Sequence, residues 1–419
     1  MRPLLLAACA TTALTALPSF AADPAGVVKT YADIAEATYG DSLSTAKTLQ
    51  TTIDAFLATP SEDGLKAART AWIAARVPYQ QSEAYRFGNP VVDDWEGRVN
   101  AWPLDEGLID YVDESYGTSE DNTLSRLNVI ATPKFSLSGT EIDATHITPD
   151  LLSGTLQEAD GQEANVATGY HAIEFLLWGQ DINGTGPGAG NRPYTDYVQG
   201  DGCTHDNCDR RAEYLKSATA LLVSDLTEMV GDWSETGAAR AAVTTDPKAG
   251  LLAILTGMGS LSYGELAGQR MKLGLMLNDP EEEHDCFSDN TYNSYFNDGI
   301  GIRNVYLGRY TRADGSVVSG PSIAELVAAV DPKVDTQLKS ELDATVTALG
   351  AIKTKAEGGM AYDQMLAAGN KEGEALIMGG VNALVTQTQS VQRAIAALGL
   401  QAVAFEGSES LDNPNAIFQ

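Results

Sequence analysis

The sequence predicts an all-α protein of long helices joined by a few long loops, and three observations support this class. Apolar residues recur with the spacing of a buried helix face along almost the whole chain. Strand-like alternation is scarce, and its clearest instance, residues 311–321, predicts only a small hairpin. The 419 residues exceed what one hydrophobic core usually serves, so two domains are expected.

Residues 1–21 are typical of an export signal. Arg2 provides a positive start, an apolar stretch follows, and Ser19 and Ala21 are the small residues that a signal peptidase requires. A lipoprotein signal ending at Cys9 is the weaker alternative, because the apolar run before Cys9 is short. We therefore expect an exported, periplasmic protein, with attachment to the outer membrane left open. No later stretch is apolar for long enough to predict a transmembrane segment.

Three long stretches carry the clearest helical period: residues 27–58, 209–233 and 375–400. Residues 181–202 are rich in Gly, Asn and Pro, which favour turns, and are predicted to be a linker. This divides the chain into an N-terminal bundle, residues 22–180, and a C-terminal bundle, residues 203–419. Residues 75–88 and 261–274 both carry Tyr, Glu and Arg in that order, which indicates that the two bundles are related.

The stretch GYHAIEFLLWGQD, residues 169–181, places a titratable pair inside an apolar helix. His171 and Glu174 lie three residues apart and so share one face, which Trp178 continues. A carboxylate buried there must be paired, protonated or bound to a metal, because an isolated buried charge is very costly. The spacing alone leaves two interpretations open: a shared metal ion, or a His–Glu hydrogen bond that locks the core.

Further ligands are expected to be mainly carboxylates, and an oxygen-rich set suits iron, although another divalent metal remains open. Glu83 shares a helical face with Tyr79 and Arg86, in a helix that Pro78 is expected to kink. Glu265 lies close to Arg270 in the second half. The predicted metal ligands are His171, Glu174, Glu83 and Glu265, and the predicted surrounding residues are Arg86, Tyr79, Asp105, Glu106, Trp178 and Arg270. Asp105 and Glu106 are also explained by the start of a helix, where acidic residues are favoured.

Two other segments carry potential ligands. Cys203 and Cys208 enclose a four-residue loop, for which a disulfide is favoured over a metal knuckle in an exported protein. Residues 281–302 are rich in oxygen ligands but lack the register of a calcium-binding loop. We expect an ordered loop lining the site there, with a solvated acidic turn as the alternative.

The formal net charge of −30 disfavours nucleic acids and anionic membranes as partners. Solubility of an exported protein explains most of this charge. A role in handling cations is compatible with it.

The motif formed by Gly169, His171 and Glu174, together with residues 102–110 and 281–302, resembles the imelysin-like family of exported, iron-regulated proteins. The resemblance implies two bundle-like halves, with the motif in an interdomain pocket near their interface. It also implies a role in iron uptake, with a membrane iron transporter or a periplasmic redox protein as partner.

Three functions follow from these observations. Metal binding in periplasmic iron acquisition is favoured. A metallopeptidase ranks second, because the motif holds no second histidine and Glu174 cannot easily be both ligand and base. A non-catalytic cleft that binds a polymer or a partner protein ranks third.

Overall fold

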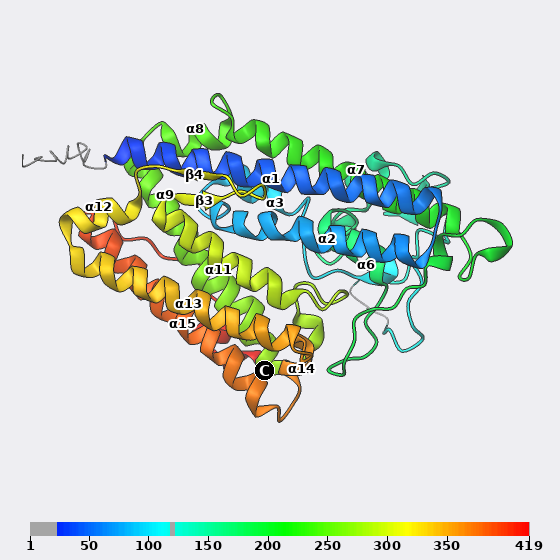
Figure 1. Ribbon diagram of the computed structural model, residues 1–419. Coiled ribbons are helices and arrows are strands. Elements are labelled where there is room, and N and C mark those ends of the chain that lie inside the picture. Colours follow the sequence, from blue (N-terminus) through cyan, green and yellow to red (C-terminus); the bar gives the residue numbers. More distant parts are fainter. Residues whose placement is uncertain (1–22, 118–121, 419) are drawn as a thin grey trace, which may run out of the picture.

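A computed structural model describes residues 23–117 and 122–418, and the regular structure in this part of the chain is mainly helical (Figure 1). The predicted all-α class is confirmed. The predicted signal, residues 1–21, lies outside the described residues.

The first bundle is organised by the long helix α1 (Pro24–Ala58). Its start follows from the local sequence: Asp23 caps the helix by accepting from the Gly26 N–H at 2.7 Å, and Pro24 occupies the first turn. Helices α2 (Glu62–Ser82) and α7 (Cys208–Trp233) run alongside α1, as Figure 1 shows, and the shorter α6 (Gly169–Trp178) packs against both α2 and α7. Helix α6 is thereby enclosed.

The second bundle contains α11 (Thr291–Leu307), α13 (Pro332–Glu357) and α15 (Lys371–Ala397). Helix α9 (Pro247–Ser260) continues into a π-helical segment of 12 residues, η6 (Leu261–Lys272), which packs against α15. Helix α11 also packs against α2, so the two bundles share a direct interface.

The remaining elements are short. The helices are α3 (Pro90–Glu96), α4 (Glu106–Ile109), α5 (Pro149–Leu151), α8 (Ala238–Thr244), α10 (Leu273–Leu277), α12 (Ile323–Val330), α14 (Tyr362–Leu366) and α16 (Glu409–Asp412). Single turns of other helical types are η1 (Glu83–Tyr85), η2 (Leu152–Leu156), η3 (Ala159–Gly161), η4 (Tyr194–Tyr197), η5 (Gly200–Gly202), η7 (Pro280–Glu282) and η8 (Ala416–Phe418).

Two antiparallel hairpins complete the fold. The predicted hairpin is present as β3 (Arg309–Thr311) and β4 (Val317–Ser319). A second one, β1 (Lys134–Leu137) with β2 (Thr140–Asp143), was not predicted. Helix α2 contains Pro78, remains helical through it, and changes to a tighter turn only at Glu83.

The division of the chain at residues 181–202 differs from the prediction. Helix α7 follows this segment but packs against α1 and α6, so the first bundle takes helices from both sides of it. The segment is also anchored rather than a free linker: Arg192 donates to Asp110 at 2.7 Å and to Asp196 at 3.1 Å, and all three side chains are buried. Its Gly and Pro content indicated the turns correctly but could not reveal these ion pairs.

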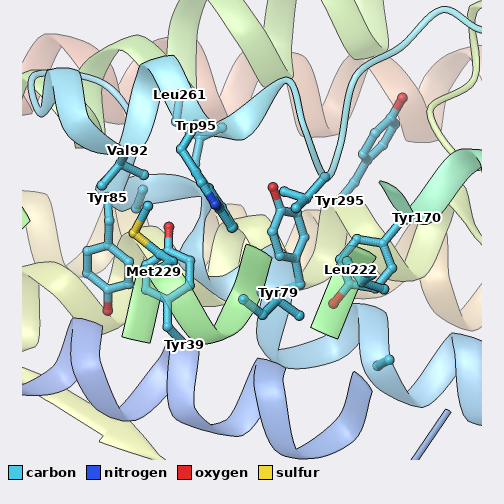
Figure 2. Close-up of a cluster of buried hydrophobic side chains, with 14 of the residues drawn as sticks. Tyr39, Tyr79, Tyr85, Val92, Trp95, Tyr170, Leu222, Met229, Leu261 and Tyr295 are labelled. Atoms are coloured by element: carbon cyan, nitrogen blue, oxygen red, sulfur yellow. The ribbon is translucent and has the colours of Figure 1, made fainter. Parts of the chain in front are cut away.

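Aromatic side chains fill much of the core of the first bundle. Figure 2 shows Tyr39, Tyr79, Tyr85, Tyr170 and Trp95 among the buried residues. Tyr39 meets Trp95 edge-on with ring centroids 5.9 Å apart, an arrangement that adds to the stability gained by burial. These rings lie beside the helices that carry the candidate site.

Candidate metal centre

Gly169 fixes where α6 begins. Its φ of +80° lies in the left-handed region, and a Cβ at this position would collide with the carbonyl oxygen of Val99. The next residue, Tyr170, donates its backbone N–H to that same oxygen at 2.7 Å. The glycine of the motif therefore allows the close approach that places His171 in the interior.

His171 and Glu174 contact each other as the spacing predicts. The distance from His171 Nδ1 to Glu174 Oε2 is 3.0 Å, and neither residue is more than 1% exposed. The other carboxylate oxygen, Glu174 Oε1, accepts from the backbone N–H of Ser288 at 2.9 Å and from its hydroxyl at 2.6 Å. Burial and the nearby Asp285 raise the pKa of Glu174 well above its ordinary value, and the Ser288 hydrogen bonds oppose this shift. The His–Glu hydrogen bond considered as an alternative is thus present.

This hydrogen bond leaves the second ring nitrogen of His171 available. His171 Nε2 is buried and has no hydrogen-bond partner among the described residues. Burial, followed by the charge of Arg76, lowers the pKa of His171 to about 3, so the imidazole is neutral at physiological pH. In the tautomer whose Nδ1 donates to an ionised Glu174, Nε2 carries the free lone pair that a metal ion binds.

His284 and Asp285 bring two more metal-binding groups to the same place. One ligand atom each from His171, His284 and Asp285 lies within 4.8 Å of the others, and all three residues are buried. The two imidazole rings meet edge-on with centroids 4.8 Å apart, and His171 Nδ1 lies 3.9 Å from Asp285 Oδ1. Burial lowers the pKa of His284 well below its ordinary value, so this ring is neutral as well.

Arg76 on α2 contacts the centre from the first bundle. It donates to Asp285 Oδ1 at 2.7 Å and to Asn100 Oδ1 at 2.6 Å. Burial alone would raise the pKa of Asp285, but Arg76 holds it below its ordinary value. Among the described residues, no Lys or Arg side chain forms an ion pair with Glu174, although the charge of Arg76 opposes the rise of its pKa. With both carboxyl groups ionised, the centre carries one negative charge more than Arg76 neutralises.

Glu83 and Glu265 do not join this centre, contrary to the prediction. Arg270 Nη2 lies 2.7 Å from Glu83 and 2.8 Å from Glu265, and Arg270 Nη1 lies 3.3 Å from Asp298. The buried guanidinium gathers these carboxylates into a separate ionic cluster. Asn100 connects the two clusters, because its side-chain amide approaches Glu83 Oε1 at 3.5 Å while its oxygen accepts from Arg76.

The other predicted residues have mainly structural contacts. Arg86 pairs with Asp93 at 2.9 Å and approaches Glu96 at 3.5 Å. Tyr79 packs on Tyr170, and Trp178 packs on Trp72, with ring centroids 4.8 and 5.4 Å apart. Asp105 accepts a hydrogen bond from the Tyr116 hydroxyl at 3.1 Å. Glu106 lines a surface cleft.

The cleft approaches the centre through Trp102. It has an empty volume of about 1100 Å³, and its walls include Trp102, Cys286 and Phe287. The Trp102 ring also meets the His284 ring edge-on at 6.1 Å between centroids. Trp102 thus borders this cleft and also contacts His284 of the buried centre.

The cysteines are divided between a bridge and a free thiol. Cys203 and Cys208, the pair favoured from the sequence, form a disulfide. His205 lies inside that loop, 2.5 Å from Asp196. Its described contacts do not include His171, His284 or Asp285. Cys286 is the free cysteine among the described residues, and burial raises the pKa of its thiol.

Four residues of the centre were not predicted: Arg76, His284, Asp285 and Ser288. Arg76 had a local signal, since it stands between Trp72 and Tyr79 on the apolar face of a helix. The other three belong to the oxygen-rich segment that was expected to line the site, but the sequence did not indicate which of its many polar residues face inward.

In the parts of the chain that the structure describes, no helix combines the length and apolar character needed to cross a membrane. The family model described as imelysin matches residues 35–391. Iron-regulated protein A from Synechococcus elongatus is 23% identical over 321 residues, which cover 75% of this chain and 72% of that protein. A crystal structure from Parabacteroides distasonis, of a protein that carries the name iron-regulated protein A precursor, shares the fold. Its TM-score is 0.65 at 20% identity, covering 90% of this chain and 95% of the other. Because the family model spans most of the sequence, the chain belongs to the imelysin family.

Proposed function

We propose that this imelysin-family protein binds iron at the centre formed by His171, His284 and Asp285, and that it acts in periplasmic iron acquisition. The observation that carries the proposal is the convergence of two neutral imidazoles and one carboxylate, with their ligand atoms within 4.8 Å of one another in the interior. The names of the two relatives, both iron-regulated proteins, agree with iron as the metal.

The donor set fits a first-row transition metal. Two imidazoles and a carboxylate are a combination that proteins use for ferrous iron. The unpartnered Nε2 of His171 is the orphaned atom that a bound ion would satisfy. Glu174 holds the ring through Nδ1 and is itself fixed by Ser288, which is the usual arrangement for orienting a ligating histidine. Glu174 thus acts mainly by positioning His171.

Electrostatics at the centre also favour a cation. Arg76 forms an ion pair with Asp285, whereas the Glu174 carboxylate accepts hydrogen bonds from Ser288 and is affected by Arg76 only through its charge. A bound cation would offset the cost of ionising Glu174 in the interior. Arg76 limits the net negative charge, so the site should favour a divalent over a trivalent ion.

Metal binding tests this proposal. Protein purified from its native compartment should contain iron in near-stoichiometric amount, and anaerobic titration calorimetry of metal-free protein should show one ferrous site. His171→Ala and His284→Ala should each weaken binding at least 100-fold. His146→Ala is the matched control, because this exposed histidine contacts only Glu213 at 3.2 Å among the described side chains.

Equal iron affinity in His171→Ala, His284→Ala and the control would overturn the assignment. The expected partners, a membrane iron transporter or a periplasmic redox protein, remain part of the proposal. The metallopeptidase alternative has less support, because His171 and Glu174 are at most 1% exposed and a polypeptide could not reach them in this conformation. A chelator-sensitive cleavage assay on an unfolded protein checks that alternative.

A further inference from the structure

A second group of carboxylates lies outside the His171 centre and brings together three distant parts of the chain. Asp181 follows α6, Asp289 precedes α11, and Asp363 belongs to α14. One carboxylate oxygen from each lies within 4.8 Å of the others. Such an approach of three acids is unfavourable unless a cation or protons offset it.

The surroundings provide no positive charge. Among the described residues, no Lys, Arg or His side chain forms an ion pair with Asp181, Asp289, Asp363 or the neighbouring Glu283. Asp181 accepts from the backbone and side-chain amides of Asn183 at 2.9 and 2.7 Å. These neutral donors do not compensate the combined charge.

Two buried carboxylates point to a missing ligand. Asp363 is 2% exposed, and neither of its carboxylate oxygens makes a hydrogen bond of normal geometry in the described structure. Glu283 is 1% exposed, and its Oε2 is likewise without a partner. Buried polar atoms are nearly always paired with protein, water or an ion, so these oxygens require a partner.

There is room for that partner. A small cavity is lined by Asp181, Glu283 and Asp363, together with Glu106 and Glu281. These five carboxylates all add to the negative potential of the cavity.

We propose that Asp181, Asp289 and Asp363 form a calcium site, with Glu283 as a further oxygen donor. Ca²⁺ takes oxygen ligands at about 2.3–2.6 Å, so two ligands on opposite sides of the ion are about 5 Å apart, which the observed spacing allows. The proposed donors include no nitrogen or sulfur, which disfavours zinc and copper. Ca²⁺ tolerates the irregular geometry of ligands from three separate segments better than Mg²⁺ does.

This site is distinct from the proposed iron centre, although the same segment contributes to both. Along residues 283–290, His284 and Asp285 belong to the His171 centre, whereas Glu283 and Asp289 belong to the acidic group. A calcium ion would tie this segment to Asp181 beside the first bundle and to Asp363 in the second.

Calorimetric titration of chelator-treated full-length protein with CaCl₂ tests the proposal. Wild-type protein should bind one Ca²⁺ and unfold at a higher temperature when it is bound. Asp363→Asn, and separately Asp289→Asn, should weaken Ca²⁺ binding at least tenfold. Asp343→Asn is the matched control, since that exposed aspartate pairs with Arg303 on the surface and should leave Ca²⁺ affinity unchanged.

His171→Ala should also retain Ca²⁺ binding, which separates this site from the iron centre. The absence of a stoichiometric Ca²⁺ site in wild-type protein would overturn the proposal whatever the variants do. So would Ca²⁺ affinity in Asp363→Asn equal to that of wild type, or binding of Mg²⁺ in preference to Ca²⁺.

Discussion

Removal of the Asp110 carboxylate should destabilise the protein strongly, because this side chain holds two buried guanidinium groups. Asp110 lies 2.7 Å from Arg192 Nη1 and 2.6 Å from Arg211 Nε, and it accepts a further bond from Arg211 Nη2 at 3.0 Å. All three side chains are at most 1% exposed. In Asp110→Ala, two buried positive charges lose a shared counter-ion.

The magnitude follows from the contacts that remain. Removing one partner of a buried ion pair costs about 3–5 kcal/mol. Arg192 keeps Asp196 at 3.1 Å, and Arg211 keeps backbone carbonyls such as that of Asp196 at 3.0 Å, so the loss is only partly compensated. We expect the free energy of unfolding to fall by about 3–4 kcal/mol.

Urea unfolding at pH 7, followed by far-UV circular dichroism and by tryptophan fluorescence, measures this loss. Asp343→Ala is the control, because its partner Arg303 lies on the surface and such pairs contribute about 0–1 kcal/mol. A loss below about 1 kcal/mol in Asp110→Ala, equal to that of the control, would refute the view that this buried network anchors residues 181–202.

Three further predictions concern other parts of the fold. Gly169→Ala should lower the free energy of unfolding by about 3 kcal/mol or more, because its positive φ and the contact with Val99 leave no room for a Cβ; unfolding in urea checks this, and an unchanged midpoint would contradict it. Burial raises the pKa of Glu96 to about 7 from an unfolded value near 4.5. Folding thus favours its protonated form. The free energy of unfolding of wild type should therefore fall relative to that of Glu96→Gln, by up to about 3 kcal/mol, as the pH rises from 5 to 8. Unfolding curves of both proteins at both pH values test this, and a difference in free energy that stays constant with pH would refute it. Replacing Cys203 and Cys208 with Ser should cost about 2 kcal/mol, the loop-closure value for so short a ring; reduction of wild-type protein should give the same shift in a thermal scan, and no shift in either experiment would rule out a stabilising role.

Much of the fold could be predicted from local periodicity. The helices at residues 27–58, 209–233 and 375–400 were recognised because each buries one face over many turns. The hairpin of β1 and β2 was missed, although its strands are longer than those of the recognised hairpin of β3 and β4. Helix α7 belongs to the predicted second half but packs against α1 and α6, and the turn-rich segment that precedes α7 does not encode this packing.

In the candidate site, too, only contacts between residues close in sequence could be predicted. His171 and Glu174 were found because a separation of three residues determines their proximity on a helix. Arg76 and Asp285 are 209 residues apart in sequence, and no local rule brings them together. Only the folded structure shows that Glu83 and Glu265 both pair with Arg270 instead of lying beside His171.

Residues 283–290 contribute to both proposed centres, so the measured affinity of each centre should depend on whether the other is occupied. A metal ion bound at either centre would restrict the conformations of residues 283–290 and so change the affinity of the other centre. Such linkage acts equally in both directions. Iron titrations in calcium-free buffer and in millimolar calcium should then yield two different dissociation constants for iron. The calcium titration at fixed iron should shift by the same factor.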